Sequence, residues 1–415
     1  MKNSKSKLNE RIGPLLEKGF LEQVYPGAVL LIAQATEMLY FNAAGMACLE
    51  PEKEAMRLDT LFDLASLTKV LATVPALMHL LTKRVLRLDS TLCSLLPDLP
   101  DVCAASEETR SITVRHLLAH SSGLAAWHPF YQDVLAKRIP FGLEAKEQIY
   151  RMLFGLPLVS PPGQKSLYSD LDFILLGILI EKTRGLSLEE ICSAEIYKPL
   201  GMFKTFFGSQ INRPCSCTTP QGRKIALDPP LEKGDEGGPL PWLKGESGDC
   251  QTKSKSLNLP VAATEFSDWR GGVLKGEVHD ENAYVMGGSA GHAGLFSTAE
   301  DIFLFCQNII LSLRDNQGFW PRALMAEVVR RQNLPSGSTW ALGWDTPSAT
   351  GSTSGELFSP YSIGHTGFTG TSIWIDLAAE LTVIFLTNRV HPSRSNERIR
   401  SFRPLLHNSI REIII

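Results

Sequence analysis

The sequence predicts an α+β protein in which both ends of the chain build one antiparallel sheet. Short strand-like apolar segments occur near each end, and helical periodicity fills the middle of the 415-residue chain. The strand-like segments are residues 28–33, 38–43, 372–376 and 381–387. We therefore expect helices to flank this sheet and a mainly helical lobe to lie beside it.

The composition is that of an ordinary globular protein with a large core. Hydrophobic residues make up 44% and charged residues 20% of the chain. A formal net charge of −3, with no block of Lys and Arg, argues against a nucleic-acid partner. Residues 1–11 are polar and no apolar segment follows them, so we expect neither a signal peptide nor a transmembrane helix. These features predict a cytoplasmic protein without a membrane partner.

Eight cysteines at irregular spacing fit reduced thiols in that compartment. Cys215, Cys217 and Cys250 could together bind a soft metal, but no second close pair completes a four-ligand zinc pattern. We therefore expect free thiols, with neither a metal nor a cofactor.

Helical periodicity and turn residues set the order of the elements along the chain. Pro26 and Gly27 stop a first amphipathic helix, and residues 35–37 join the first two strands as a hairpin. Helices are expected at residues 8–24, 70–81, 113–118, 145–156, 170–183, 187–196, 298–313 and 396–413.

This order predicts two lobes with a cleft between them. Residues 1–65 and 345–415 would form an α/β lobe that contains the sheet, and residues 66–344 a mainly helical lobe. From about residue 208 to 260, Pro, Gly, Ser and Lys dominate and apolar periodicity is lost. That segment is either a loop or insertion that covers a cleft, or a solvated excursion without function. An active site would lie in the cleft.

One short motif, Ser66-Leu67-Thr68-Lys69, directly precedes the apolar helical run at 70–81. Residues three apart on a helix share a face, so Ser66 and Lys69 lie within reach of each other. A largely buried lysine can lose its proton and activate a serine as a covalent nucleophile. Alternatively, Ser66 is only a helix cap and Lys69 an exposed lysine, since this motif is common by chance.

Two further motifs could supply partners for Ser66. Tyr168-Ser169-Asp170 precedes an apolar helix, and its phenol could relay protons between nucleophile and leaving group. His365-Thr366-Gly367-Phe368 precedes the strand at 372–376, where small residues would let a substrate lie along the strand edge. A backbone N–H there could complete an oxyanion hole. Taken singly, the first motif could be a packing tyrosine and the second an ordinary turn.

Taken together and in this order, the three motifs resemble the serine β-lactamase and penicillin-binding-protein superfamily. The similarity is greatest to class C β-lactamases and their D-peptidase and esterase relatives, which carry Ser-x-x-Lys, Tyr-x-Asn and Lys-Thr-Gly. The resemblance runs from about residue 26 to 388 and is supported by residues 112–124, 199–202 and 294–301. It implies a β-lactamase/transpeptidase-like fold.

The resemblance also implies a role for each motif residue. Ser66 would be the acylated nucleophile, Lys69 its base partner and Tyr168 the general acid and base. The substrate would lie against Asp170, His365, Thr366, Gly367 and Phe368, with the N–H groups of Ser66 and Phe368 as the oxyanion hole. No metal is implied.

Two positions depart from the superfamily pattern. Asp170 replaces its asparagine, and an ionised aspartate accepts hydrogen bonds but cannot donate one to an amide carbonyl. Asp170 could instead pair with Lys69 or attract a cationic substrate group. His365 replaces a lysine and is at most partly charged near neutral pH, so the grip on a substrate carboxylate should be weaker. Neutral esters should therefore be better substrates than β-lactams.

Three other groups of residues in the sequence could carry a different chemistry. Gly287-Gly288-Ser289-Ala290-Gly291 matches Gly-x-Ser-x-Gly, but its flanks lack the strand and helix of a nucleophile elbow. His116 and His120 are spaced for zinc but lack the glutamate of a metalloprotease helix. The polar cluster around Glu277, His279 and Asp280, with His292 nearby, could be a metal site, although we favour a loop near the cleft.

The sequence thus predicts a serine hydrolase that cleaves an ester or amide of a small molecule through an acyl-enzyme. One alternative is an amidase for peptides or muropeptides that contain D-amino acids, or a weak β-lactamase. Another is a binding protein of the same fold in which Asp170 has disabled Lys69.

Overall fold

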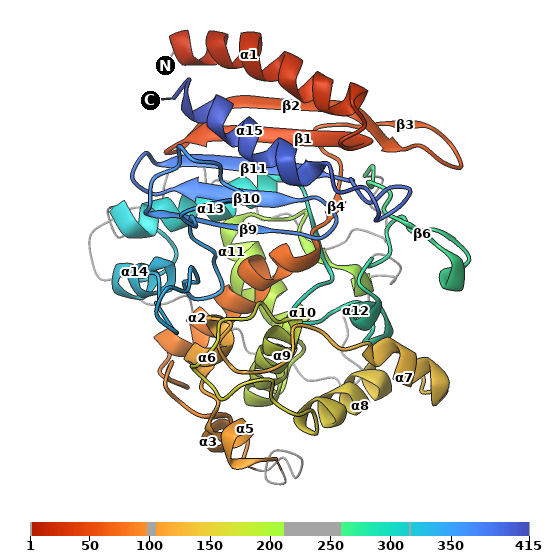
Figure 1. Ribbon diagram of the computed structural model, residues 1–415, viewed down its shortest axis with the longest axis vertical. Helices are drawn as coiled ribbons and strands as arrows, with labels where there is room; N and C mark the ends of the chain where they lie inside the picture. Colours follow the sequence, from red (N-terminus) through yellow and green to blue (C-terminus); the bar gives the residue numbers. More distant parts are fainter. Residues whose placement is uncertain (1, 98–104, 211–258, 315–316, 415) are drawn as a thin grey trace, which may run out of the picture. The chain divides into compact units, whose positions relative to one another are not determined.

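A six-stranded antiparallel sheet joins the two ends of the chain, as the sequence predicts (Figure 1). The computed structural model describes residues 2–97, 105–210, 259–314 and 317–414. The strand order is β3-β2-β1-β11-β10-β9. The strands are β1 (Gly27–Gln34), β2 (Glu37–Cys48), β3 (Glu54–Ala55), β9 (Ser362–Thr366), β10 (Ser372–Asp376) and β11 (Leu381–Thr387). The pairing of β1 with β11 places Leu30 opposite Phe385 and closes the sheet at its centre.

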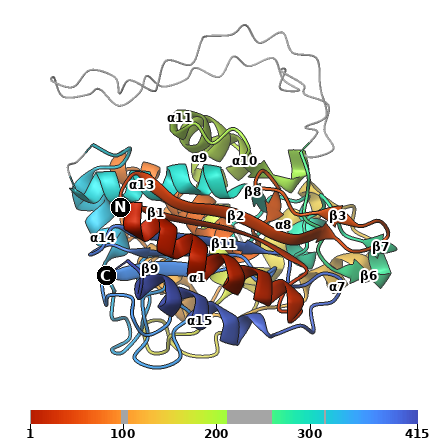
Figure 2. The same ribbon diagram turned by 90° about the horizontal axis from the view of Figure 1, so that it is seen from above.

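Helices cover both faces of this sheet because side chains along β1 alternate between two cores. Leu30 and Ile32 share a hydrophobic cluster with α1 (Lys2–Leu21) and α15 (Ile399–Arg411). Val29 and Leu31 belong to a larger core that includes α13 (Ala299–Arg314). Figure 2 shows α1 and α15 on one side of the sheet and α13 on the other.

The middle of the chain is mainly helical, and two small sheets, β4-β8-β5 and β6-β7, accompany it. In place of the single helix expected at 187–196, three helical elements follow one another, namely α10 (Leu188–Cys192), the π-helix η3 (Ser193–Tyr197) and α11 (Lys198–Leu200). The further elements are β4 (Phe62–Asp63), η1 (Ala65–Leu67), η2 (Lys69–Thr73), α2 (Val74–Thr82), α3 (Leu92–Leu95), α5 (Glu107–Ser111), α6 (Val114–Leu118), α7 (Phe130–Ala136), α8 (Leu143–Phe154), α9 (Asp170–Arg184), α10 (Leu188–Cys192), η3 (Ser193–Tyr197), α11 (Lys198–Leu200), β5 (Phe206–Phe207), η4 (Gly208–Gln210), β6 (Phe266–Ser267), η5 (Asp268–Arg270), β7 (Gly272–Val273), α12 (Glu281–Val285), β8 (Leu295–Ser297) and α14 (Arg322–Val329).

One helical segment, Ala65–Thr82, is long and apolar enough to cross a membrane by length and composition alone. In the protein 78% of it is buried, as in the core helix of a globular fold. The apolar side chains of this segment pack inside the protein, since the main core includes Val70, Leu71, Leu77 and Leu80. Burial inside the protein therefore explains this composition without a membrane.

The division into two lobes at residues 65/66 and 344/345 stays a prediction. Within the described residues, the parts before 211 and after 259 belong to one compact unit. Most of the predicted 208–260 segment, and with it Cys215, Cys217 and Cys250, lies outside the described residues. The four cysteines that the structure describes are free thiols, namely Cys48, Cys93, Cys192 and Cys306.

Candidate active site

Ser66 lies in a tight turn between a short strand and a buried helix. β4 leads into the 3-10 helix η1, and η2 and α2 follow as one continuous helical segment. Ala65 has a φ of +46°, a left-handed conformation that an alanine rarely adopts. The buried carboxylate of Asp63 holds this turn by accepting the N–H of Ala65 at 2.8 Å and that of His279 at 2.6 Å. The strained residue thus directly precedes the candidate nucleophile.

Lys69 lies beneath Ser66 with its side chain 0% exposed. Its ammonium donates to three acceptors, which are Asp170 Oδ1 at 2.6 Å, Ser66 Oγ at 3.0 Å and the carbonyl oxygen of His292 at 3.1 Å. Three donors therefore meet three acceptors, and the pairing of Asp170 with Lys69 that the sequence allowed is present.

Two opposing influences act on the pKa of Lys69. Burial alone would lower its pKa, but the carboxylate of Asp170 and the neighbouring Tyr168 outweigh burial and raise the pKa above the ordinary value. Lys69 is therefore a cation in the resting site. Of the possibilities that the sequence left open, the site therefore contains the pairing of Lys69 with Asp170, whose counter-charge lies 2.6 Å away, and the role of Lys69 as base partner of Ser66 stays a prediction.

Tyr168 closes the site from the segment that leads into α9. Its ring lies 5.0 Å from Lys69 Nζ and stacks on Trp340 with ring centroids 5.6 Å apart. Burial raises the pKa of its phenol, while the charge of Lys69 and hydrogen bonds with Lys69 and Ser66 oppose that shift. Tyr168 is thus a neutral phenol at neutral pH, positioned to donate or pass on a proton.

His365 and Thr366 end β9, the edge strand of the sheet, and a turn at residues 367–371 then leads into the expected strand at 372–376. An edge strand can leave N–H and C=O groups for an extended substrate, but on β9 those of Gly364 already bond to the backbone of Asp345. Burial and the charge of Lys69 lower the pKa of His365 to about 3, so its imidazole is neutral. Its Nδ1 lies 3.0 Å from the carbonyl oxygen of Thr366, and its Nε2 is buried without a partner among the described residues.

The turn after β9 is tied to the nucleophile's backbone. The hydroxyl of Thr369 donates to the carbonyl oxygen of Asp63 at 2.8 Å, and that of Thr371 donates to the carbonyl oxygen of Leu64 at 3.2 Å. A side chain at Gly367 would collide with the Leu64 carbonyl and the Thr371 hydroxyl. These contacts hold Phe368 close to Ser66, as an oxyanion hole built from their two N–H groups requires.

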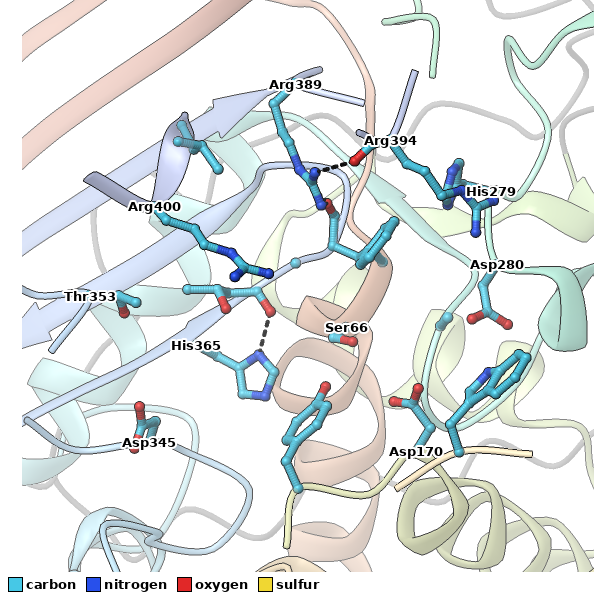
Figure 3. A pocket seen from close by; sticks show the side chains of 18 of the residues that line it. Ser66, Asp170, His279, Asp280, Asp345, Thr353, His365, Arg389, Arg394 and Arg400 are labelled. Carbon is cyan, nitrogen blue, oxygen red and sulfur yellow. Dashed lines mark hydrogen bonds between the residues drawn. The ribbon is translucent and has the colours of Figure 1, made fainter. Parts of the chain in front are cut away.

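A cavity of about 680 Å³ brings these residues together (Figure 3). All of the predicted site residues line it except Lys69, which lies beneath its floor. The predicted residues along its wall are Ser66, Tyr168, Asp170, His365, Thr366, Gly367 and Phe368. Figure 3 shows Ser66 between His365 on one side and Asp170 and Asp280 on the other.

Several cavity residues escaped the sequence analysis. The aromatic side chains of Trp127 and Trp340 and the carboxylate of Asp345 carried no motif. Four arginines also line the cavity, namely Arg389, Arg394, Arg400 and Arg403. The expectation that no Lys/Arg block stands out overlooked them, since residues 389–403 contain these four and Arg398. That run was the signal by which they could have been found.

The rival constellations are not built as reactive sites. Ser289 lies in a loop, without the strand and helix that a nucleophile elbow needs, and does not line the cavity. His116 caps α6, where its Nδ1 accepts from the N–H of Thr113 at 3.2 Å. His120 lies 3.1 Å from Asp172 in the core.

The polar cluster around His279 and Asp280 borders the cavity, as expected of a loop near a cleft. His279 Nε2 lies 2.9 Å from Glu265, and His292 Nε2 lies 2.9 Å from Asp280. Among the described residues, no group of three or more His, Cys, Asp or Glu side chains could hold a metal ion. The cluster therefore forms a hydrogen-bonded wall.

The fold, with its Ser-Lys pair at the edge of an antiparallel sheet, defines a β-lactamase-like serine hydrolase. A family model described as Beta-lactamase matches residues 9–405. The chain therefore belongs to the β-lactamase family.

Relatives of known name support the same class. The chain is 31% identical over 383 residues to a putative D-alanyl-D-alanine carboxypeptidase of Escherichia coli (strain K12), covering 88% of this chain and 79% of the relative. It is 31% identical over 387 residues to an N-acetylmuramyl-L-alanine amidase of Bacillus subtilis (strain 168), covering 88% and 78%. Among solved structures, EstCE1, a hydrolase with promiscuous acyltransferase activity, superposes with a TM-score of 0.64 at 22% identity, covering 96% of this chain and 99% of that one.

Proposed function

We propose that the protein hydrolyses an ester or amide through an acyl-enzyme on Ser66 and is not an efficient β-lactamase. The observation that carries the proposal is the hydrogen bond from buried Lys69 to Ser66 Oγ at the floor of a cavity. Asp170 and the neutral His365 argue against efficient β-lactam turnover, because neither supplies the donor or the fixed charge found at these positions in class C β-lactamases.

The proton-carrying side chains of the site, Ser66, Lys69 and Tyr168, support a sequence of steps. The reactive form is the one in which the Lys69 ammonium has lost one proton to solvent, which leaves a neutral amine beside the Asp170 carboxylate. The amine then takes the hydroxyl proton of Ser66 as Oγ bonds to the substrate carbonyl carbon. As the leaving group departs, the phenol of Tyr168 protonates it and is reprotonated from Lys69. Water releases the acyl group by the same steps in reverse.

A peptide-like amide that contains a D-amino acid, as in a muropeptide, is a second candidate substrate. The names of the curated relatives favour it, since they include a carboxypeptidase for D-alanyl-D-alanine and an amidase for N-acetylmuramyl-L-alanine. The edge strand β9 offers the backbone groups that such a substrate would pair with. The cytoplasmic location remains a prediction.

A panel of substrates tests the proposal. Turnover of p-nitrophenyl esters, D-amino-acid amides, a muropeptide and nitrocefin is compared at equal concentrations of enzyme, and a fluorophosphonate probe reports on the reactive serine. The proposal expects labelling of Ser66 and a higher kcat/KM for an ester or amide than for nitrocefin. Absence of both labelling and turnover would instead favour a binding protein in which Asp170 has disabled Lys69.

Replacing Asp170 with asparagine is expected to move the pH dependence of turnover to lower pH. The carboxylate raises the pKa of Lys69, so without it the effect of burial prevails and the neutral amine forms at lower pH. An opposite charge this close shifts a pKa by about 1–3 units, and the acidic limb of kcat/KM should move by a similar amount. The measurement is a pH profile with a neutral p-nitrophenyl ester.

Asp345→Asn is the matched control, because that carboxylate also lines the cavity but bonds to Thr339 and Thr346 rather than to a lysine. The acidic limb of the kcat/KM profile of Asp345→Asn should lie at the same pH as that of the wild type. If the acidic limb of kcat/KM in Asp170→Asn lies at the same pH as in the wild type, or at higher pH, the role given to Asp170 is contradicted.

A further inference from the structure

Arg389 is a buried cation whose hydrogen bonds, among the described residues, all go to backbone carbonyl oxygens. It follows β11 and is only 8% exposed. Its Nε and Nη2 donate to the carbonyl oxygen of Phe368 at 3.0 Å and 2.7 Å. Its Nη1 donates to the carbonyl oxygens of Arg394 at 2.9 Å and Asn396 at 2.7 Å. Figure 3 shows its side chain reaching from above toward Ser66, with a dashed line to Arg394.

The positive charge of Arg389 is retained in spite of this burial. Burial outweighs the carboxylate of Glu397 and lowers the pKa of the guanidinium, but an arginine stays protonated at neutral pH. A buried cation is unfavourable unless polar groups complete it, and here three carbonyl oxygens do so. A neutral side chain could pack in this place without that penalty, so the charge indicates a task beyond packing.

Phe368 is held both at its carbonyl group and at its ring. Its carbonyl oxygen accepts two N–H groups of Arg389, whose Cζ also lies 4.7 Å from the centre of the Phe368 ring. The same ring stacks on His279, with ring centroids 5.6 Å apart. A lysine could not make both contacts of Arg389, because it lacks the planar fork of donors.

Gly370 makes room for this contact. It has a φ of +112°, and a Cβ atom there would lie 2.6 Å from Cγ of Arg389 and would collide with the hydroxyl of Thr387. Its N–H donates to the carbonyl oxygen of Gly367 at 3.0 Å and closes the turn. The turn therefore needs a conformation and an open space that glycine supplies, and the stem of Arg389 passes through that space.

The N–H of Phe368 is a donor that this turn leaves without a partner. The N–H of Gly367 donates to the carbonyl oxygen of Thr371 at 2.7 Å, and that of Gly370 closes the turn. Within the described residues, the N–H of Phe368 has no acceptor. Phe368 and Ser66 line the same cavity, so this donor is available to a ligand that is bonded to Ser66.

We infer that Arg389 is a positioning residue for the oxyanion hole. By holding the carbonyl group and the ring of Phe368, it fixes the N–H of Phe368 where negative charge develops on the substrate carbonyl oxygen. Donors that are fixed in advance are effective because they need no reorganisation during the reaction. The inference rests on the proposed acyl-enzyme function and adds the residue that keeps one of its charge-stabilising donors in place.

The kinetics of Arg389→Gln test this role with the best p-nitrophenyl ester from the panel. The substitution should lower kcat about ten- to a hundredfold, which is less than the loss of a whole oxyanion donor. The KM should change by less than about twofold, because acylation and deacylation both pass through an oxyanion and slow together. Arg389→Lys keeps a cation without the fork and should lose about three- to tenfold in kcat. Circular dichroism shows whether each variant is folded.

Phenylboronic acid gives a second readout that does not depend on turnover. Its boron bonds to Ser66 Oγ and places a negatively charged oxygen in the oxyanion hole. The affinity of Arg389→Gln for this compound should therefore fall by about the same factor as kcat. A loss of kcat without a loss of this affinity would show that Arg389 acts in another way, and would overturn the inference.

Arg398→Gln is the matched control. The Nη1 of Arg398 also donates to a backbone carbonyl oxygen, that of Glu22 at 2.9 Å, but Arg398 does not line the cavity. Its kcat and its affinity for phenylboronic acid should equal those of the wild type. This variant therefore shows what the loss of an arginine–carbonyl contact does when the contact lies away from the oxyanion hole.

Hydrogen–deuterium exchange tests the positioning itself, without substrate. The N–H groups of Gly367 and Gly370 are bonded within the turn, so their exchange reports how well the turn is held. In Arg389→Gln, peptides that cover residues 366–371 should exchange at least about threefold faster than in the wild type. In Arg398→Gln, the exchange of these peptides should be unchanged.

The outcomes separate this inference from the proposed function. If no ester is hydrolysed but exchange in the turn rises in Arg389→Gln alone, the positioning role stands and the proposed function fails. If esters are hydrolysed but either the exchange or the kcat of Arg389→Gln equals that of the wild type, the positioning role is refuted and the proposed function stands. If neither hydrolysis nor faster exchange is found, both fail. Should Arg389→Gln not fold, the same comparisons are made with Arg389→Lys, and wild-type values there refute the role.

Discussion

Substituting Ser66 with alanine should abolish turnover and probe labelling, with kcat/KM falling by more than about a thousandfold. Ser66 Oγ is the atom to which buried Lys69 donates, and no new bond to a substrate carbonyl can form without it. The measurement is hydrolysis of the best p-nitrophenyl ester from the panel, with circular dichroism to show that the variant is folded.

Ser289→Ala is the control for this substitution, because Ser289 lies in the rival Gly-x-Ser-x-Gly sequence but outside the cavity lining. That variant should keep most of its activity. Acyl-enzyme found by mass spectrometry on a peptide that contains Ser289 would overturn the assignment of Ser66.

Lys69→Met should damage both catalysis and stability. Methionine keeps the length of the side chain but removes the proton carrier, so turnover should fall to near background. It also leaves the Asp170 carboxylate without its partner, and breaking a buried ion pair typically costs about 3–5 kcal/mol of unfolding free energy. Unfolding by denaturant gives the change in the free energy of unfolding. The rate of ester hydrolysis at low denaturant concentration, where the variant is folded, gives the change in catalysis.

Lys146→Met provides the comparison, because Lys146 and Glu181 also form a largely buried ion pair at 2.6 Å, between α8 and α9 and away from the cavity lining. Both variants should lose stability, but only Lys69→Met should lose activity per folded molecule. If Lys146→Met is equally inactive while folded, the loss in Lys69→Met reflects general destabilisation and not a role in proton transfer.

The sequence was a good guide wherever local pattern decides structure. Alternating or continuous apolar segments located β1, β2, β10 and β11 within a few residues, and the hairpin at 35–37 is present. The three motifs located the cavity wall because Ser66 and Lys69 are only three residues apart and the other motifs end or begin regular elements. Such features depend on neighbours in the chain, which a single sequence displays.

Features that depend on distant residues were not accessible in that way. The sequence allowed a pairing of Lys69 with Asp170, 101 residues away in the chain, but it could not show that the pairing forms and holds the pKa of Lys69 above its ordinary value. Asp63 carries no motif residue's signature in the sequence, yet its carboxylate fixes the turn before Ser66 by accepting the N–H groups of Ala65 and His279. The five arginines between residues 389 and 403 look alike in the sequence, which gave no hint that Arg389 and Arg403 are buried. Burial and counter-charges are tertiary properties, so the charge state of a side chain could not be inferred from motifs.

The hydrogen bonds from Thr369 and Thr371 to the backbone around Ser66 bear on how the protein is made. They join residues 306 and 307 positions apart, and β9, β10 and β11 supply three of the six strands of the main sheet. A nascent chain still attached to the ribosome at residue 360 would have its serine and lysine but no partner for the β1 edge. Reactivity should therefore appear only once synthesis is nearly finished, so that incomplete chains carry no active nucleophile.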